Sequence, residues 1–108
     1  MLAERLTTTV VVAKHALEVA QTNVGTDHPD VATSLNNLAV LYKAQGDYAK
    51  AAPLYKRALA IREKALGPDH PDVATSLNNI ALLYRATGRM NEAEKLEARV
   101  KEIKAIKR

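Results

Sequence analysis

A stretch of 20 residues occurs twice in this chain of 108 residues, with a spacing of 42 positions. It begins at Gly25 as Gly-Thr-Asp-His-Pro-Asp-Val-Ala-Thr-Ser-Leu-Asn-Asn-Leu-Ala-Val-Leu-Tyr-Lys-Ala and returns at Gly67 with 16 of its 20 positions identical. Counting the same period backwards makes residues 1–24 the second half of an earlier, truncated unit. We therefore expect one domain over residues 1–108, with a partial unit at 1–24, a full unit at 25–66 and a second at 67–108.

Apolar residues within each unit have the spacing of α-helices. In the first full unit they include Val31, Leu35, Leu38 and Tyr42, which fall on one stripe of a helix. A proline opens each first helix, because its fixed φ suits the first helical position, and a glycine ends it. The sequence thus predicts five helices, near residues 3–24, 29–45, 48–65, 71–87 and 90–107. Pro53 should kink the third helix or remove one of its hydrogen bonds.

Composition favours an all-α fold and excludes several kinds of site. Apolar residues make up 47% of the chain, which is enough for a core, but Phe and Trp are absent. Such a composition favours closely packed helices over a β-sandwich, which would need more aromatic and β-branched residues. Because the chain has no cysteine, it has no disulfide, no thiolate zinc site and no cysteine nucleophile.

The first full unit resembles the tetratricopeptide repeat (TPR) family. The residues that carry the resemblance are Leu35, Leu38, Ala39, Tyr42, Gly46, Tyr48, Ala51, Tyr55 and Ala58. The period of 42 is similar to that of a longer subclass, found in kinesin light chains and in many bacterial TPR proteins. This resemblance implies an α-α superhelix (a TPR solenoid) of five antiparallel helices, with two full repeats and a partial one. It implies little about the partner, because the unit serves proteins of unrelated function.

The last helix departs from the repeat in a way that suggests an end. Three apolar positions of the second helix, Tyr55, Leu59 and Ala60, become Glu97, Lys101 and Glu102 in the last unit. We interpret residues 90–107 as a capping helix that is polar because no further unit covers it.

The first helix carries apolar residues on more than one side. One stripe is Leu2, Leu6, Val10, Ala13 and Leu17, and a second is Val12, Ala16 and Val19. Since the partner helix of its own unit is missing, either this helix packs against another copy or the chain was cut from a longer protein. A self-assembly element that forms a homodimer through this helix is therefore an alternative function.

The leading hypothesis places the binding site on the first helix of each full unit. The side opposite the predicted core carries Thr33, Asn36, Val40 and Lys43, and in the second unit Thr75, Asn78, Leu82 and Arg85, with Asn37 and Asn79 at the flank. In the family this side lines a concave groove. Asparagines can bond a peptide backbone, and the two cations favour an acidic peptide. The alternatives are a solvated helix face, or asparagines that bond between repeats.

Catalytic and metal sites are disfavoured. His28 and His70 each lie between aspartates, but the two motifs are a whole repeat apart, so a role in the turn and helix start is favoured over metal binding. Ser34 and Ser76 recur with their surroundings, which favours a structural role over nucleophilic catalysis. We expect no enzyme activity and no cofactor.

The net charge of +4 belongs to the C-terminal segment, because residues 1–84 sum to zero. In residues 85–108 basic residues alternate with glutamates and no aromatic is interleaved, so a solvated helix face is favoured over nucleic-acid binding. No apolar run is long enough to span a membrane, and the N-terminus lacks the features of a signal peptide. These observations predict a cytoplasmic protein whose partner is another protein.

Overall fold

Five α-helices follow one another in the computed structural model, which describes the backbone of residues 2–106 and the side chains of residues 8–106. They are α1 (Leu2–Val24), α2 (Pro29–Ala44), α3 (Tyr48–Leu66), α4 (Pro71–Ala86) and α5 (Met90–Ile106). The all-α prediction is confirmed, and the predicted bounds hold to within one residue at every end inside the described range. The predicted end of the last helix at residue 107 lies outside the described residues.

Both repeated turns start a helix in the same way. The imidazole Nδ1 of His28 accepts a hydrogen bond from the backbone N–H of Asp30 at 3.0 Å, and His70 does the same for Asp72 at 3.0 Å. Each histidine therefore satisfies a backbone donor that the first turn of the helix leaves free. At the other end of α2, Gly46 adopts a φ of +80°, which an L side chain rarely adopts.

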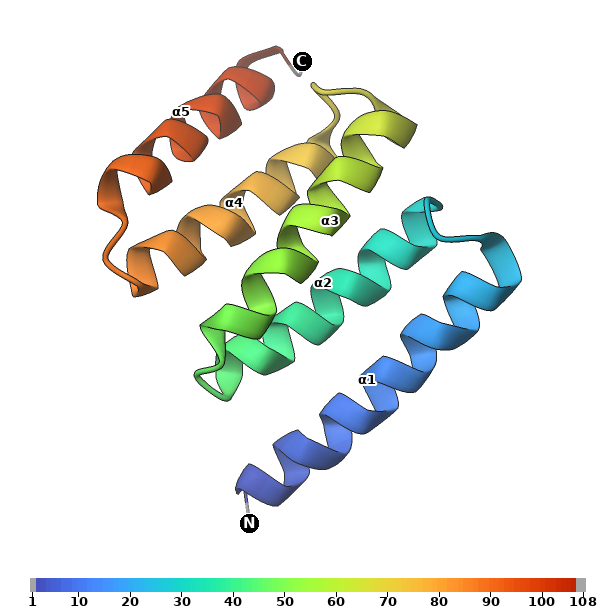
Figure 1. Cartoon of the computed structure of the whole chain (residues 1–108). Helices are drawn as coiled ribbons and strands as arrows, with labels where there is room; N and C mark the ends of the chain where they lie inside the picture. The colour runs from blue at the N-terminus through green and yellow to red at the C-terminus, as the bar shows by residue number, and fades with distance from the viewer. Residues whose placement is uncertain (1, 107–108) are drawn as a thin grey trace.

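The helices form a row in which sequential neighbours pack in antiparallel pairs (Figure 1). The pairs α2–α3 and α4–α5 are the two hairpins, α3 joins them by packing against α4, and α1 packs against α2. The described part of the chain is extended rather than spherical, with dimensions of 41 × 35 × 21 Å. This arrangement is the stacked solenoid that the repeat predicts.

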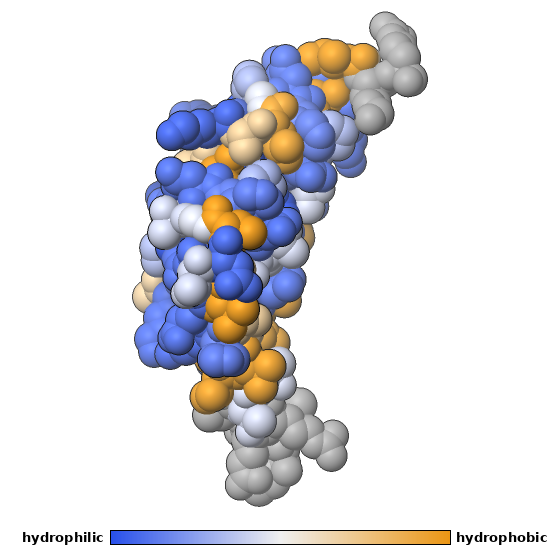
Figure 2. Space-filling view, turned by 90° about the vertical axis from the view of Figure 1, so that its right-hand side faces the viewer, coloured by the Kyte–Doolittle hydropathy of each residue, from blue (hydrophilic) through white to orange (hydrophobic). Residues whose placement is uncertain are grey.

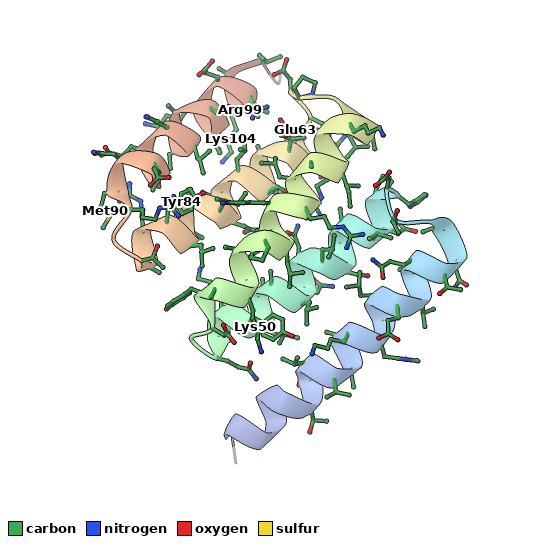
Figure 3. The ribbon with its side chains drawn as sticks, viewed as in Figure 1. Lys50, Glu63, Tyr84, Met90, Arg99 and Lys104 are labelled. Carbon is green, nitrogen blue, oxygen red and sulfur yellow. The ribbon has the colours of Figure 1, made fainter. Side chains whose placement is uncertain are left out.

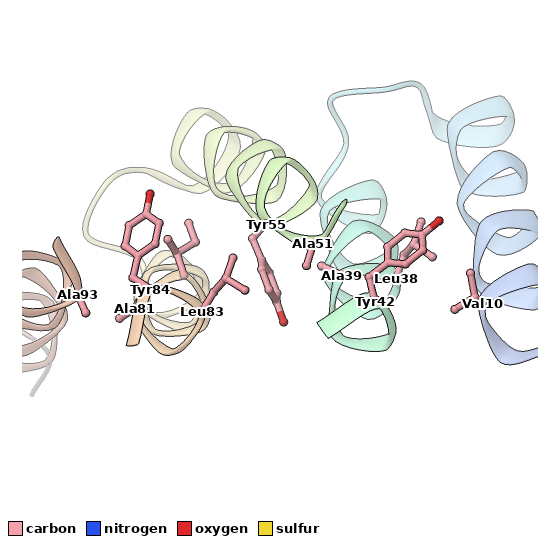
Figure 4. Packing of buried hydrophobic residues seen from close by; sticks show 11 residues of the cluster. Val10, Leu38, Ala39, Tyr42, Ala51, Tyr55, Ala81, Leu83, Tyr84 and Ala93 are labelled. Atoms are coloured by element: carbon pink, nitrogen blue, oxygen red, sulfur yellow. The ribbon is translucent and has the colours of Figure 1, made fainter. Parts of the chain in front are cut away.

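Small residues bring the two helices of each hairpin together. Ala39 of α2 and Ala51 of α3 are both fully buried, and their equivalents Ala81 and Ala93 are fully buried between α4 and α5. Large side chains fill the space beside them. Figure 4 shows Tyr55 extending from α3 between α2 and α4, so that one side chain fills the gap between the two repeats.

α3 continues through its proline. Pro53 is the sixth residue of the helix and is exposed. Because Pro53 lacks a backbone N–H, the carbonyl of Ala49 has no helical donor. Ala49 and Pro53 are both exposed, so water can bind this carbonyl. The predicted loss of one hydrogen bond follows from the structure, while the packing of α3 on both sides keeps the helix in one piece.

Candidate functional site

The first helices of the two repeats expose side chains at nearly the same repeat positions, which together we term the α2–α4 face. It consists of Thr33, Asn37 and Val40 on α2 and Thr75, Asn78, Leu82 and Arg85 on α4, with Asn79 half-buried at its edge. These positions recur every three or four residues, so they lie on one side of each helix. Val40 and Leu82 are 49% and 45% exposed, which places a large apolar side chain at the same position of each repeat.

Asn36 does not lie on the α2–α4 face, contrary to the sequence expectation. It is only 7% exposed. With its amide oriented so that the oxygen faces Arg62, it accepts hydrogen bonds from the guanidinium at 2.7 and 3.2 Å. The alternative in which asparagines bond between repeats applies only indirectly, because Asn36 bonds Arg62 of its own repeat and Arg62 in turn bonds α4. Asn78, its equivalent in the last repeat, is exposed because the described chain places no further helix against it.

Arg62 is a structural residue that sequence reasoning missed. Its Nη1 donates to Ser76 Oγ at 2.9 Å and to the backbone carbonyl of Asp72 at 3.5 Å, both on α4. Together with Asn36, these contacts join α2, α3 and α4 through one guanidinium. Burial lowers the pKa of Arg62, an effect that the nearby charge of Asp72 opposes. The signal available in the sequence was a second cation, Lys104, 42 positions later.

The charge of Arg85 is largely neutralised within the chain. Its Nε and Nη2 donate to the two carboxylate oxygens of Glu97 at 2.7 and 2.5 Å, so α4 is tied to α5 by a bidentate ion pair. Hydrogen bonding to each other raises the pKa of Arg85 and lowers that of Glu97. In the preceding repeat the position of Glu97 is occupied by Tyr55, so half-buried Lys43 has no carboxylate at the equivalent place. Lys43 and Arg85, the two cations that the sequence analysis assigns to an acidic ligand, therefore differ in their surroundings.

A tyrosine hydroxyl reaches the space between the two first helices. Figure 4 shows that the ring of Tyr55 points away from α3 and ends in its hydroxyl between α2 and α4. The side chain is 2% exposed, and burial raises its pKa, so the hydroxyl remains protonated. The sequence suggested only a packing role for this residue.

The histidines and serines take structural positions. Both repeated histidines cap helices, as described above, and Ser76 is fully buried against Arg62. Within the described residues, no group of three or more His, Cys, Asp and Glu side chains could hold a metal ion. No helix in the same range is long and apolar enough to cross a membrane.

Two further apolar surfaces lie at the ends of the row. On α1, Val12 and Val19 are 62% and 43% exposed. At the other end, α4 and α5 form a hollow of about 340 Å³, which we term the α4–α5 groove. Figure 2, viewed from the right-hand side of Figure 1, shows several apolar patches on a mostly hydrophilic surface, some of them near its two ends.

Comparison with known proteins agrees with this geometry. The tetratricopeptide repeat family model matches residues 31–72 and 73–105. A solved structure from Podosopora anserina, described as a kinesin light chain with nearly identical TPR-like repeats, superimposes with a TM-score of 0.84 at 27% identity. BtubC (BKLC) from P. vanneervenii superimposes with a TM-score of 0.86 at 32% identity. No curated protein sequence matches the chain.

These similarities cover nearly all of this chain but not the whole of the similar proteins. The chain is covered to 96% and 97%, respectively, whereas it spans 49% and 42% of the two solved chains. The similarity therefore concerns the repeat architecture that both of them contain.

Proposed function

We propose that this chain, which belongs to the tetratricopeptide repeat family, binds a short segment of a partner protein on its α2–α4 face. Repeats of this family are generally protein–protein interaction modules. The segment would lie across α2 and α4 in extended or helical form, in the concave groove that the family forms with its first helices.

The repetition of Val40 and Leu82 is the observation that carries this proposal. Each is a large apolar side chain that is nearly half exposed, and each has an asparagine three residues before it, Asn37 and Asn79. The apolar side chain can contact an apolar side chain of a peptide, and the neighbouring amide can donate to and accept from the peptide backbone. This combination therefore suits a peptide ligand. Because only two first helices contribute, we expect an affinity on the order of micromolar.

Lys43 supports a preference for acidic segments. It belongs to the only repeat whose cation has no glutamate at the position of Glu97. Arg85 would bind an acidic group only in competition with Glu97.

A peptide library displayed on phage tests the proposal. Peptides selected on the native chain should lose at least about tenfold in affinity for the Val40→Asp/Leu82→Asp variant, since apolar contacts are replaced by charge. A Val11→Asp/Val12→Asp variant, with two exposed valines of α1 changed, is the matched control and should bind as the native chain does. Equal binding by all three proteins would contradict the proposal, provided that circular dichroism shows them folded.

Self-assembly through α1 is a second candidate, favoured by a different observation. Val12 and Val19 are exposed on α1, while Val10 on another side of the same helix is buried at 6% exposure. Water-exposed valines on a helix of this kind could pair with a second copy. In that case Val12→Lys/Val19→Lys should turn a dimer into a monomer in sedimentation experiments. A native chain that is monomeric at high concentration would rule this candidate out.

A further inference from the structure

We infer that the α4–α5 groove, which adjoins the α2–α4 face at Thr75 and Asn78, is a second binding site that receives an amphipathic helix of a partner protein with acidic or hydroxyl side chains in its first turns. The chain contains its own occupied example of such a groove. The hairpin of α2 and α3 is the equivalent unit one repeat earlier, and α4 packs against its second helix, α3.

The occupied groove shows what kind of helix fits. Val73 and Leu77 of α4 are fully buried in a cluster with Val100 and Ile103 of α5, and Leu59 of α3 packs against this cluster. Beside this apolar contact, the first two turns of α4 bring Ser76 Oγ and the Asp72 carbonyl to Arg62. The fitting helix therefore combines apolar residues with an oxygen that accepts from a cation.

The α4–α5 groove keeps the polar groups and an apolar floor at the positions 42 residues later, although Lys101 takes the place of Leu59. The equivalent pairs are Ala32 and Ala74, Asn36 and Asn78, Ala58 and Val100, Ile61 and Ile103, and Arg62 and Lys104. The apolar floor remains apolar, the amide remains an amide, and the cation remains a cation. In the last repeat, Tyr55, Leu59 and Ala60 are replaced by Glu97, Lys101 and Glu102, which suggested a capping helix. These replacements do not affect the five positions of the groove.

The polar groups of the groove are available for a partner. Asn78 and Lys104 are exposed, and Lys104 forms no ion pair with any side chain that the structure describes. Figure 3 shows Lys104 on α5, near α4. An ammonium group is a compact donor that binds a carboxylate, hydroxyl or carbonyl oxygen without the fork geometry of arginine.

Charge and packing favour a partner helix over a second copy of the chain. Residues 85–108 hold eight basic and four acidic groups, so an acidic helix is attracted to this end. The two helices of this chain that have the fitting sequence are already covered, α2 by α1 and α3, and α4 by α3 and α5. A second copy would have to unpack one of them before it could enter the groove.

A synthetic peptide with the chain's own α4 sequence, residues 68–88, provides a defined probe. We expect it to bind the full chain with a Kd on the order of 100 µM, measured by NMR titration, and to shift the amide signals of Ala74, Val100 and Ile103. A peptide in which Ser76 is replaced by glutamate should bind several-fold more tightly, because it offers a carboxylate to Lys104.

Charge reversal on α5 identifies the contact. Lys104→Glu should weaken binding of the glutamate peptide by about tenfold, whereas Lys95→Glu, the same change at an exposed position on the opposite side of α5, should leave it within about twofold. A peptide with lysine at the Ser76 position should regain affinity for the Lys104→Glu chain. Both variants change exposed residues, so folding is preserved.

Several results would overturn the inference. These are no signal shifts at about 1 mM peptide, equal weakening by Lys104→Glu and Lys95→Glu, or a dimer in sedimentation that Lys104→Glu dissolves. Weakening by Val40→Asp/Leu82→Asp would place the peptide on the α2–α4 face instead. Failure of the phage selection, by contrast, would count against the proposed function and leave this groove unaffected.

Discussion

At the scale of single residues, Arg62 is the clearest case of one side chain that holds two repeats together. Replacing it by methionine keeps the apolar stem but removes every hydrogen bond to Asn36, Asp72 and Ser76. We expect Arg62→Met to lower the free energy of unfolding by about 2 kcal/mol, because buried acceptors lose their donor. Urea denaturation followed by circular dichroism measures this loss.

A double-mutant cycle separates this contact from a general effect of lost charge. Arg62→Met and Ser76→Ala should be non-additive, since each removes the same hydrogen bond, while Lys64→Met at an exposed position should change stability by less than about 0.5 kcal/mol. Additive losses would show that the guanidinium does not act through Ser76.

At the scale of helices, the Arg85–Glu97 ion pair links α4 to α5 and makes their contact dependent on pH. The hydrogen bond from Arg85 holds the pKa of Glu97 below its ordinary value. A carboxyl group of this kind stabilises the fold above its unfolded-state pKa, and the contribution is lost as pH falls through its folded-state pKa. Glu97→Gln should therefore be less stable than the native chain at about pH 7, and the difference should disappear at about pH 2.

Thermal unfolding across this pH range checks the prediction. Glu102→Gln, in the same helix at an exposed position, is the matched control and should show no comparable convergence with the native chain. A constant difference between Glu97→Gln and the native chain at every pH would contradict a role for ionisation.

The helices could be predicted from the sequence because their signals are local. Proline and glycine mark where helices start and end, and the apolar spacing defines their inner sides. Asn36 shows the limit of this reasoning: its position on the helical wheel lies beside Val40, and only the placement of α3 and α4 decides that it is buried. Identical residues in the two repeats, such as Asn36 and Asn78, have different surroundings because their neighbours differ.

Side-chain contacts between residues far apart in the chain could not be predicted from the sequence, because they also depend on how the helices pack. The exposure of Arg85 follows from its position on the helix, but its pairing with Glu97 depends on how α5 lies against α4. The polar residues of α5 suggested a closed end, although only one side of the helix had changed. Predicting the α4–α5 groove required the positions of Val100 and Ile103 relative to Ala74.

At the scale of the whole molecule, the helices are arranged in a row, so the stability of the chain depends on contacts between successive units. Each helix packs chiefly against its neighbours in the chain, so total stability is close to a sum of unit and interface contributions. An additional unit should therefore add its own contribution together with one new interface. The nature of that interface depends on whether Arg62 or Lys104 faces the added first helix.

Two chains of equal length test this consequence, each longer than the native chain by one unit. One repeats residues 25–66 directly after residue 66, so that every new contact copies the one around Arg62. The other repeats residues 67–108 after residue 108, so that a second α4 enters the α4–α5 groove and meets Lys104. We expect both to be more stable than the native chain in urea, with a larger denaturant dependence because more surface is buried.

The first of these two chains should be the more stable. In the second chain, Glu97, Lys101 and Glu102 come to lie at an internal interface where the native repeat has Tyr55, Leu59 and Ala60. The new interface of the first chain buries a larger apolar area and contains Arg62, so it repeats the contacts that join α2, α3 and α4 in the native chain. These contacts make the first chain more stable than the second. Equal stability of the two chains would mean that α5 tolerates a following unit as well as α3 does, and that its polar residues do not mark an end.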